Sequence, residues 1–411
     1  MKKKTIITVA VIIVLLVLVG LYVLKVTKDI TREITKREIA RITQQEVGNI
    51  TNQEVDRITQ EEIDRITQEK TQEITDQILG TGSKENLEEY ECNLKPKEKE
   101  FNKEPYYTGP LIDTHVHMPV ASKIVSSMAI QSGFEDMPYE GDISVNYITC
   151  VFDSEGISKA FEFYIMPNVV LSSSVRSAKS AKEKYPEKIV PFFMPPPISS
   201  LHPSAVDVAD TIRSNKGLFN GIGELAIYHY PSNIQPDGPY FLELYRIANE
   251  QYLIVMMHPG TNHKAAVEKV VNENPKVKFL IHGDQDKAWI LELMSKFPNV
   301  YYSLDADMTS IYGFEPKHEF KKPTKEEWLA YFRQNFDSIV NKAVGKWKTA
   351  IETNPDRFMW GTDRWYSWHF EYETGGLLAE FGRSFIGQLD PAVQEKFAYK
   401  NAEKVLQQAA S

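Results

Sequence analysis

The sequence predicts a (β/α)8 barrel over residues 109–411, and three observations support this fold class. Short apolar runs alternate with longer amphipathic stretches, which is typical of parallel βαβ units. Eight such runs occur in about 300 residues, the expected size of a barrel. Most of the runs end in a histidine, glutamate or aspartate, and a closed barrel would bring these ends to one mouth. The alternative, an open doubly wound sheet, would spread them along a line.

The overall composition excludes several classes of protein. The chain has 411 residues, a net charge of −9 and two cysteines. These values exclude a disulfide scaffold, a collagen-like fibre, a wholly disordered chain and a strongly basic nucleic-acid binder. No proline precedes Pro96, and all six tryptophans lie at Trp289 or later. The N-terminal quarter therefore differs in composition from the rest of the chain. Because the chain is not basic, we expect no nucleic-acid partner for it.

The first segment, residues 1–24, is expected to be a membrane anchor. Residues 5–24 carry no charge, and twenty residues of helix span roughly the 30 Å core of a bilayer. A cleaved signal peptide is less consistent, because its apolar region is shorter and a small-x-small cleavage pattern is missing here. Only four residues precede the helix, which favours a single-pass protein with its barrel on the extracytoplasmic side.

Residues 25–80 repeat every eight residues and are expected to form a helical stalk. Their apolar positions recur at steps of three and five, which excludes strand alternation and favours a helix. The stalk could be a coiled-coil spacer that makes a homo-oligomer, or a solvated tether. Residues 81–108 mix charges of both signs and are expected to form a linker. Cys92 lies in this linker and Cys150 in an apolar run, so both are expected to be unpaired thiols.

The barrel elements follow in order along 109–411. Strands are expected to begin near residues 111, 147, 189, 221, 253, 278, 300 and 357, in runs such as LIDTHVHM, YITCVF and KFLIHGD. Helices are expected at 177–186, 204–215, 241–251, 264–275 and 288–298, each ending in the Asn, Pro or Lys residues that stop a helix.

Two histidines on the first strand are candidate metal ligands. His115 and His117 are two residues apart, so both side chains point to one face, the interior of a barrel. Asp113 shares this face but lies deeper, and we expect it to fix a neighbouring group.

Four further candidates end other strands. Glu224 ends the fourth, His258 the fifth, His282 the sixth and Asp363 the eighth. Each alone could be structural. With the two histidines of the first strand, these residues stand at the carboxyl ends of five strands, and together they predict a metal site.

The ordered motifs His-x-His, GxGE, HPG, xxHG and GTD resemble those of the amidohydrolase superfamily. Within it, the similarity is to the amidohydrolase-related branch that contains decarboxylases similar to the aminocarboxymuconate semialdehyde enzyme. It covers residues 109–411. The resemblance implies that His115, His117 and His258 bind a divalent metal. It also implies that His282 binds metal or polarises substrate.

The same resemblance implies roles for two carboxylates. Asp363 would bind metal and take a proton from the attacking water. Glu224 stands where many relatives have a bridging carboxylated lysine, and GIGEL is similar to the bridging glutamate motif of the TatD-like deoxyribonuclease branch. One metal ion or two therefore remain open.

Neutral imidazoles and carboxylates suit a divalent ion, for which we expect zinc, with manganese, iron or cobalt as alternatives. A bound ion lowers the pKa of its water toward 7 and polarises a carbonyl or phosphoryl oxygen. Asp363 would accept the water's proton, and His282 would stabilise the developing negative charge.

Residues after two strands are expected to contact the substrate. Tyr228 and His229 follow the fourth strand, and Arg364 and Trp365 follow Asp363. Arg364 could pair with a substrate carboxylate. The long segment 308–356 is a candidate lid.

These residues predict a membrane-tethered, metal-dependent hydrolase that acts on a C–N, C–O or P–O bond of a small molecule. Two alternatives remain. One is a decarboxylase or other lyase with the same ligands, and the other is an inactive, stalked binding protein.

Overall fold

The computed structural model describes residues 92–123, 125–126, 138–196, 201–229, 234–260, 262–283, 285–305 and 324–410, without the side chains of 229 and 408–410. All of these belong to one compact unit, Glu85–Ser411. The expected anchor and stalk lie outside the described residues and stay predictions. Within the described ranges, no helix combines the length and the apolar character needed to cross a bilayer.

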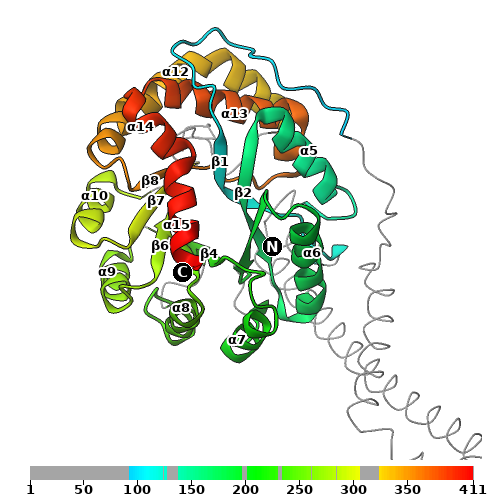
Figure 1. Cartoon of the computed structure of the whole chain (residues 1–411), viewed down its shortest axis with the longest axis vertical. Coiled ribbons are helices and arrows are strands. Elements are labelled where there is room, and N and C mark those ends of the chain that lie inside the picture. The colour runs from blue at the N-terminus through cyan, green and yellow to red at the C-terminus, as the bar shows by residue number, and fades with distance from the viewer. Residues whose placement is uncertain are drawn as a thin grey trace, which may run out of the picture. The chain divides into compact units, whose positions relative to one another are not determined.

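Eight parallel strands form one sheet in the order of the chain, with helices around it (Figure 1). The strands are β1 Leu111–His117, β2 Ile157–Ile165, β3 Ile189–Met194, β4 Gly221–Ala226, β5 Ile254–His258, β6 Lys278–Ile281, β7 Val300–Leu304 and β8 Phe358–Trp360. The first strand and the chain after the last strand are joined by two backbone hydrogen bonds. Asp363 N donates to His115 O at 2.9 Å, and His117 N donates to Arg364 O at 2.9 Å. The predicted barrel is therefore confirmed, and the open sheet is excluded.

Helices follow the strands in the alternation that the sequence predicts. They are α5 Val145–Glu155, α6 Leu171–Lys184, α7 Ala205–Ser214, α8 Pro239–Gln251, α9 Lys264–Glu273, α10 Lys287–Lys296, α12 Lys325–Thr353, α13 Tyr372–Gly387, α14 Pro391–Glu395 and α15 Asn401–Ala410. Helix α15 begins where Asn401 donates to the carbonyl oxygens of Pro355 and Phe358. These carbonyls lie at the amino end of β8, so this end of the barrel is opposite to the predicted site.

The expected second strand near 147 is wrong, because this segment is helix α5 and β2 lies ten residues later. The run YITCVF consists of residues that favour strands, but helix caps bound it on both sides. The side chain of Ser144 accepts a hydrogen bond from Tyr147 N, and Gly156 ends the helix with a φ of 70°. Lys159 and Glu162 interrupt the apolar pattern of the true strand.

The expectation of two unpaired thiols is also wrong. Cys92 and Cys150 form a disulfide, with their Cα atoms 5.4 Å apart. The error follows from the misplaced strand, because a cysteine on the outer helix α5 can reach the incoming chain.

The incoming segment 92–109 packs against the barrel, although the sequence suggests a solvated linker up to residue 108. Glu380 on α13 accepts hydrogen bonds from the backbone N–H groups of Glu100 and Phe101, at 2.8 and 2.6 Å. The ring of Phe101 stacks on Phe336 of α12, with centroids 3.9 Å apart. From Cys92 onward, this segment is therefore part of the folded unit.

The barrel interior below the mouth is filled by aromatic rings. The ring centroid of Phe192 on β3 lies 4.7 Å from that of Phe163 and 5.2 Å from that of Phe161, both on β2. All three are fully buried. This packing closes the lower barrel and gives the layer above it a rigid floor.

One buried carboxyl on β2, that of Glu162, forms no ion pair among the described residues. Glu162 is fully buried, and one of its oxygens accepts a hydrogen bond from the hydroxyl of Tyr164 at 2.8 Å. The other oxygen has no hydrogen-bond partner among the described residues. Burial raises the pKa of Glu162 to about 8, against the smaller opposing effect of the Tyr164 hydrogen bond. Glu162 is therefore protonated at neutral pH.

This raised pKa predicts a loss of stability with rising pH. The folded protein holds the proton more tightly than the unfolded chain, so the contribution is complete below about pH 4.5 and is lost as pH rises to about 8. The slope is at most about 1.4 kcal/mol per pH unit. Between pH 5 and 8, the free energy of unfolding, measured with urea, should decrease less in Glu162→Gln than in wild type. The exposed Glu183→Gln should behave as wild type, and an equal pH slope in both variants would contradict the assignment.

Candidate metal centre

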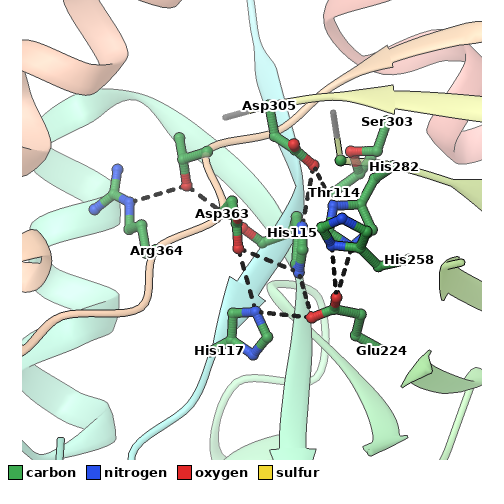
Figure 2. A network of polar contacts seen from close by, with 12 residues as sticks. Thr114, His115, His117, Glu224, His258, His282, Ser303, Asp305, Asp363 and Arg364 are labelled. Atoms are coloured by element: carbon green, nitrogen blue, oxygen red, sulfur yellow. Dashed lines mark hydrogen bonds and ion pairs between the residues drawn. The ribbon is translucent and has the colours of Figure 1, made fainter. Parts of the chain in front are cut away.

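Seven side chains meet at the carboxyl ends of the strands (Figure 2). The structure brings together all six predicted ligands and adds one residue that the sequence interpretation missed. The six are His115, His117, Glu224, His258, His282 and Asp363, and the seventh is Asp305.

Four of the predicted ligands surround one position. Glu224 Oε2 lies 3.3 Å from His117 Nε2 and 3.7 Å from His115 Nε2. Asp363 Oδ1 lies 3.2 Å from His117 Nε2 and 3.5 Å from His115 Nε2. Two nitrogens and two carboxylate oxygens therefore converge, and we call this group the first half-site.

The other oxygen of Glu224 faces a second group. Glu224 Oε1 lies 2.9 Å from His282 Nε2 and 3.3 Å from His258 Nδ1. Glu224, His258 and His282 form the second half-site, and Glu224 is the residue that the two half-sites share. Glu224 is thus placed as a carboxylate that joins two adjacent donor sets.

The arrangement of these donor atoms suits a bound divalent cation better than it suits hydrogen bonds between the side chains. His115 Nε2, His282 Nε2 and Glu224 Oε1 are buried and form no hydrogen bond among the described residues, although their partners lie close. A buried polar atom left unpaired costs about 1–3 kcal/mol. Atoms aimed at a common point, without the angles of a hydrogen bond, are the arrangement that a metal ion requires. Imidazole and carboxylate donors suit zinc, manganese, iron or cobalt.

The charges of the cluster support the same interpretation. Burial alone would raise the pKa of Glu224, but the neighbouring imidazoles, His282 first, hold it well below its usual range. Burial would lower the pKa of His115, but the charge of Asp363 and the hydrogen bond to Asp305 raise it to about 9. Without metal, the carboxylates are ionised and at least His115 is protonated at neutral pH.

Asp305 follows β7 and contacts the outer nitrogens of two histidines. Its Oδ2 lies 3.0 Å from His115 Nδ1 and 3.5 Å from His282 Nδ1. The residue was missed, although it ends the seventh strand just as Asp363 ends the eighth. The other candidate ligands were identified as polar residues at the carboxyl ends of strands. The same criterion, applied to the run VYYSLDAD, would have identified Asp305.

Asp113 holds the backbone around two ligands. Its Oδ1 accepts hydrogen bonds from Thr362 N at 2.9 Å and His115 N at 3.1 Å. Asp363 itself has a φ of 54°, a region that aspartate tolerates better than most residues. The prediction that Asp113 fixes a neighbouring group is therefore confirmed.

Gly283 explains the glycine of the xxHG motif. Its φ is 90°, and a Cβ at this position would collide with the imidazole of His258. Only glycine lets the turn after β6 pass this close to the second half-site.

The expectation that Arg364 binds substrate is wrong, because its side chain is fully buried behind Asp363. Its two terminal nitrogens pair with both oxygens of Glu155 on α5, and Nε donates to Thr362 Oγ1 at 3.3 Å. Figure 2 shows it pointing away from the ligand cluster. The position of Arg364 after a candidate ligand can be read from the sequence, but the direction of its side chain cannot.

Two of the other expected substrate residues lie against ligands. The ring of Tyr228, 46% exposed, lies 4.0 Å from the ring of His258. The ring of Trp365 meets His117 edge-on at 4.6 Å. The backbone of His229 lies in the short helix Ile227–His229, and its side chain is outside the described part of the chain.

The candidate lid 308–356 is a packed helix over most of its described part. Helix α12 begins after Thr324, whose side chain forms a capping box with Glu327. Trp328 is buried and its ring lies 5.5 Å from Trp368, in the segment that follows β8. Residues 308–323 lie outside the described ranges, so the lid stays a prediction for them alone.

Comparison with known proteins gives a family match and distant structural likenesses. The family model described as amidohydrolase matches residues 200–408, slightly more than half of the chain. No protein of curated function matches the sequence.

Among solved structures, an uncharacterised TIM-barrel protein from Bordetella bronchiseptica is 17% identical, with a TM-score of 0.48 over 74% of this chain and 100% of that one. A probable 2-pyrone-4,6-dicarboxylic acid hydrolase from Acinetobacter baumannii is 14% identical, with a TM-score of 0.49 over 72% and 99%. A 5-carboxyvanillate decarboxylase from Novosphingobium aromaticivorans, complexed with manganese, is 15% identical, with a TM-score of 0.42 over 77% and 99%. Likenesses this distant do not distinguish one activity from another.

The protonated histidine of the metal-free cluster predicts that metal binding releases protons. When Zn²⁺ is added to metal-free protein at pH 7, at least one proton per chain should leave, because a ligand imidazole must be neutral. The affinity should therefore fall as pH is lowered below about 9. Calorimetry in two buffers of different ionisation enthalpy measures the release. Binding without proton release would contradict this charge assignment.

Proposed function

Because the chain belongs to the amidohydrolase family, we propose that it is a metal-dependent hydrolase that cleaves a C–N, C–O or P–O bond of a small molecule. The observation that carries the proposal is the placement of Glu224, with one oxygen in each of two donor sets. The proposed metal is zinc, in one or two ions, and manganese, iron or cobalt would fit the same donors.

The residues divide naturally between two ions. His115, His117 and Asp363 would hold one with Glu224 Oε2. His258 and His282 would hold the other with Glu224 Oε1. A bound divalent ion lowers the pKa of water and polarises a carbonyl or phosphoryl oxygen.

Asp363 is the group best placed to move a proton. Burial would raise its pKa, but the charge of His115 and the hydrogen bond from His117 lower it, so the carboxylate is ionised at neutral pH. Its side chain is 16% exposed, whereas that of Glu224 is 5% exposed. Asp363 can therefore meet both the ligand cluster and the mouth, accept a proton from water, and return it to the leaving group.

The remaining residues would orient the substrate. Tyr228 presents an exposed ring above His258, and Trp365 lies beside His117, so both lie next to donors. We assign them to substrate contact, together with His229 from the same segment as Tyr228. His282 would stabilise negative charge that develops on the substrate, in addition to binding metal.

A decarboxylase or other lyase of the same family is the second candidate. The observation that favours it is the donor set itself, because convergent imidazoles around a metal can hold a substrate carboxylate as well as water. An inactive, stalked binding protein is less consistent, because all six predicted ligands are present and converge.

We also propose that the barrel acts outside the cytoplasm, tethered by the anchor at residues 5–24. The disulfide between Cys92 and Cys150 supports this placement, because structural disulfides persist in oxidising compartments and are rare in the cytosol. The stalk would hold the barrel away from the membrane and could join several copies.

The shared carboxylate predicts the effect of Glu224→Gln. The amide cannot offer two anionic oxygens, so metal per chain should fall by at least about one equivalent, and turnover should fall at least about 100-fold. Elemental analysis of the purified full-length protein measures the first effect. The exposed Glu243→Gln is the matched control and should keep both values. Full metal content and turnover in Glu224→Gln would refute the assignment.

Isotope analysis separates the two enzyme candidates. Turnover in H₂¹⁸O, over a panel of esters, amides, lactones, phosphate esters and aromatic carboxylates, should place one ¹⁸O atom in the product. Mass spectrometry of the product detects it. Release of carbon dioxide with no ¹⁸O in the organic product would instead establish the lyase.

A further inference from the structure

Asp305 lies where it can act on both half-sites at once. It follows β7, is fully buried, and its Oδ2 approaches the Nδ1 atoms of His115 and His282 at 3.0 and 3.5 Å. These histidines come from β1 and from the end of β6, and each belongs to a different half-site. No other described carboxylate contacts the outer nitrogens of both rings.

The contacts form a closed ring of four side chains, which Figure 2 shows around the centre of the cluster. On one side, Asp305 contacts the two Nδ1 atoms. On the other side, Glu224 Oε2 lies 3.7 Å from His115 Nε2, and Glu224 Oε1 lies 2.9 Å from His282 Nε2. Each imidazole is therefore held between two carboxylates, with the ring centroids 4.3 Å apart at an angle of 82°.

A carboxylate at one ring nitrogen decides what the other nitrogen can do. A neutral imidazole carries one proton, and a carboxylate beside Nδ1 draws it there, which leaves the Nε2 lone pair free to bind metal. Asp305 Oδ2 forms a hydrogen bond with His115 Nδ1 at 3.0 Å and faces His282 Nδ1 at 3.5 Å, so one oxygen can accept from both rings. Asp305 therefore stays an acceptor for both Nδ1–H groups.

We propose that Asp305 is a positioning residue shared by the two half-sites. It fixes the tautomer and ring orientation of His115 and His282 together, so that metal at one half-site preorganises the other. The inference rests on the proposed metal centre but not on the reaction that the centre carries out. In this assignment Asp305 acts through the outer nitrogens and not as a ligand, although it also lies within 4.8 Å of donor atoms of His115, His282 and Asp363.

Asp305→Asn tests this in the full-length protein. The same Asp305 oxygen faces both Nδ1 atoms, so the amide presents them either an uncharged, weaker acceptor or, when flipped, an N–H₂ group that opposes both Nδ1–H groups. Zinc affinity should therefore fall about 10- to 100-fold at both half-sites. Calorimetric titration of metal-free protein with Zn²⁺ measures this. The matched control is Ser303→Ala, on strand β7 two residues before Asp305. Ser303 is equally buried but bonds to Thr114 instead of an imidazole, so wild-type affinity is expected.

A spectroscopic measurement distinguishes positioning from general damage. In zinc-loaded wild type, the Nδ1–H protons of His115 and His282 should give two strongly downfield NMR signals, because both bond to a carboxylate. Asp305→Asn should shift or lose both, and Ser303→Ala should keep both. If Asp305→Asn does not fold, Asp305→Glu keeps the charge but moves the oxygen, and both signals should still change.

Three outcomes would overturn the proposal. The first is wild-type zinc affinity in Asp305→Asn or, where that variant does not fold, in Asp305→Glu. The second is a loss of zinc affinity that is confined to one half-site. The third is a cobalt(II) absorption spectrum in either variant that shows one ligand fewer, which would make Asp305 a ligand. If wild type binds zinc but turns over no substrate, the proposed function fails while this inference stands.

Discussion

The structure depends on the burial of one carboxylate, that of Glu224, among four imidazoles. An isolated carboxylate costs several kcal/mol to bury, and so does each charged imidazole, so none of these groups could occupy the position alone. Only a closed barrel brings the ends of β1, β4, β5 and β6 close enough to gather them. The two oxygens of Glu224 then divide the imidazoles into two pairs. This division places two sets of possible metal donors side by side at the mouth.

The backbone around the site is held from behind by a second set of charges. Arg364 follows a ligand but pairs with Glu155, which ties the chain after β8 to helix α5. Arg383 on α13 donates to the carbonyl oxygens of Glu155 and Gly156, and also to that of Gly109 before β1. Two segments that carry first half-site residues, β1 and the chain after β8, are therefore fixed by contacts outside the barrel. Groups that sequence inspection would place in the pocket instead determine its shape.

The extent to which the sequence predicted this arrangement follows from what its patterns encode. The carboxyl ends of parallel strands meet in a barrel, so position along the chain was enough to find His258, His282 and Asp363. The same rule applied to β7 would have found Asp305. Side-chain direction and long-range pairing are not encoded in that way, which is why Arg364 and the disulfide were misjudged. The helix α5 was mistaken for a strand because its strand-favouring residues outweighed its caps.

The disulfide at Cys92 also decides where mechanical load enters the molecule. It joins the chain to helix α5 well before that chain reaches β1 at Leu111. Tension applied to the residues before Cys92 passes through a covalent bond into the helical wall. It therefore bypasses the segment 93–110 and the first strand, which carries two ligands. Pulling on the chain from that side would therefore load helix α5 before it could peel β1, the strand with two candidate ligands, from the sheet.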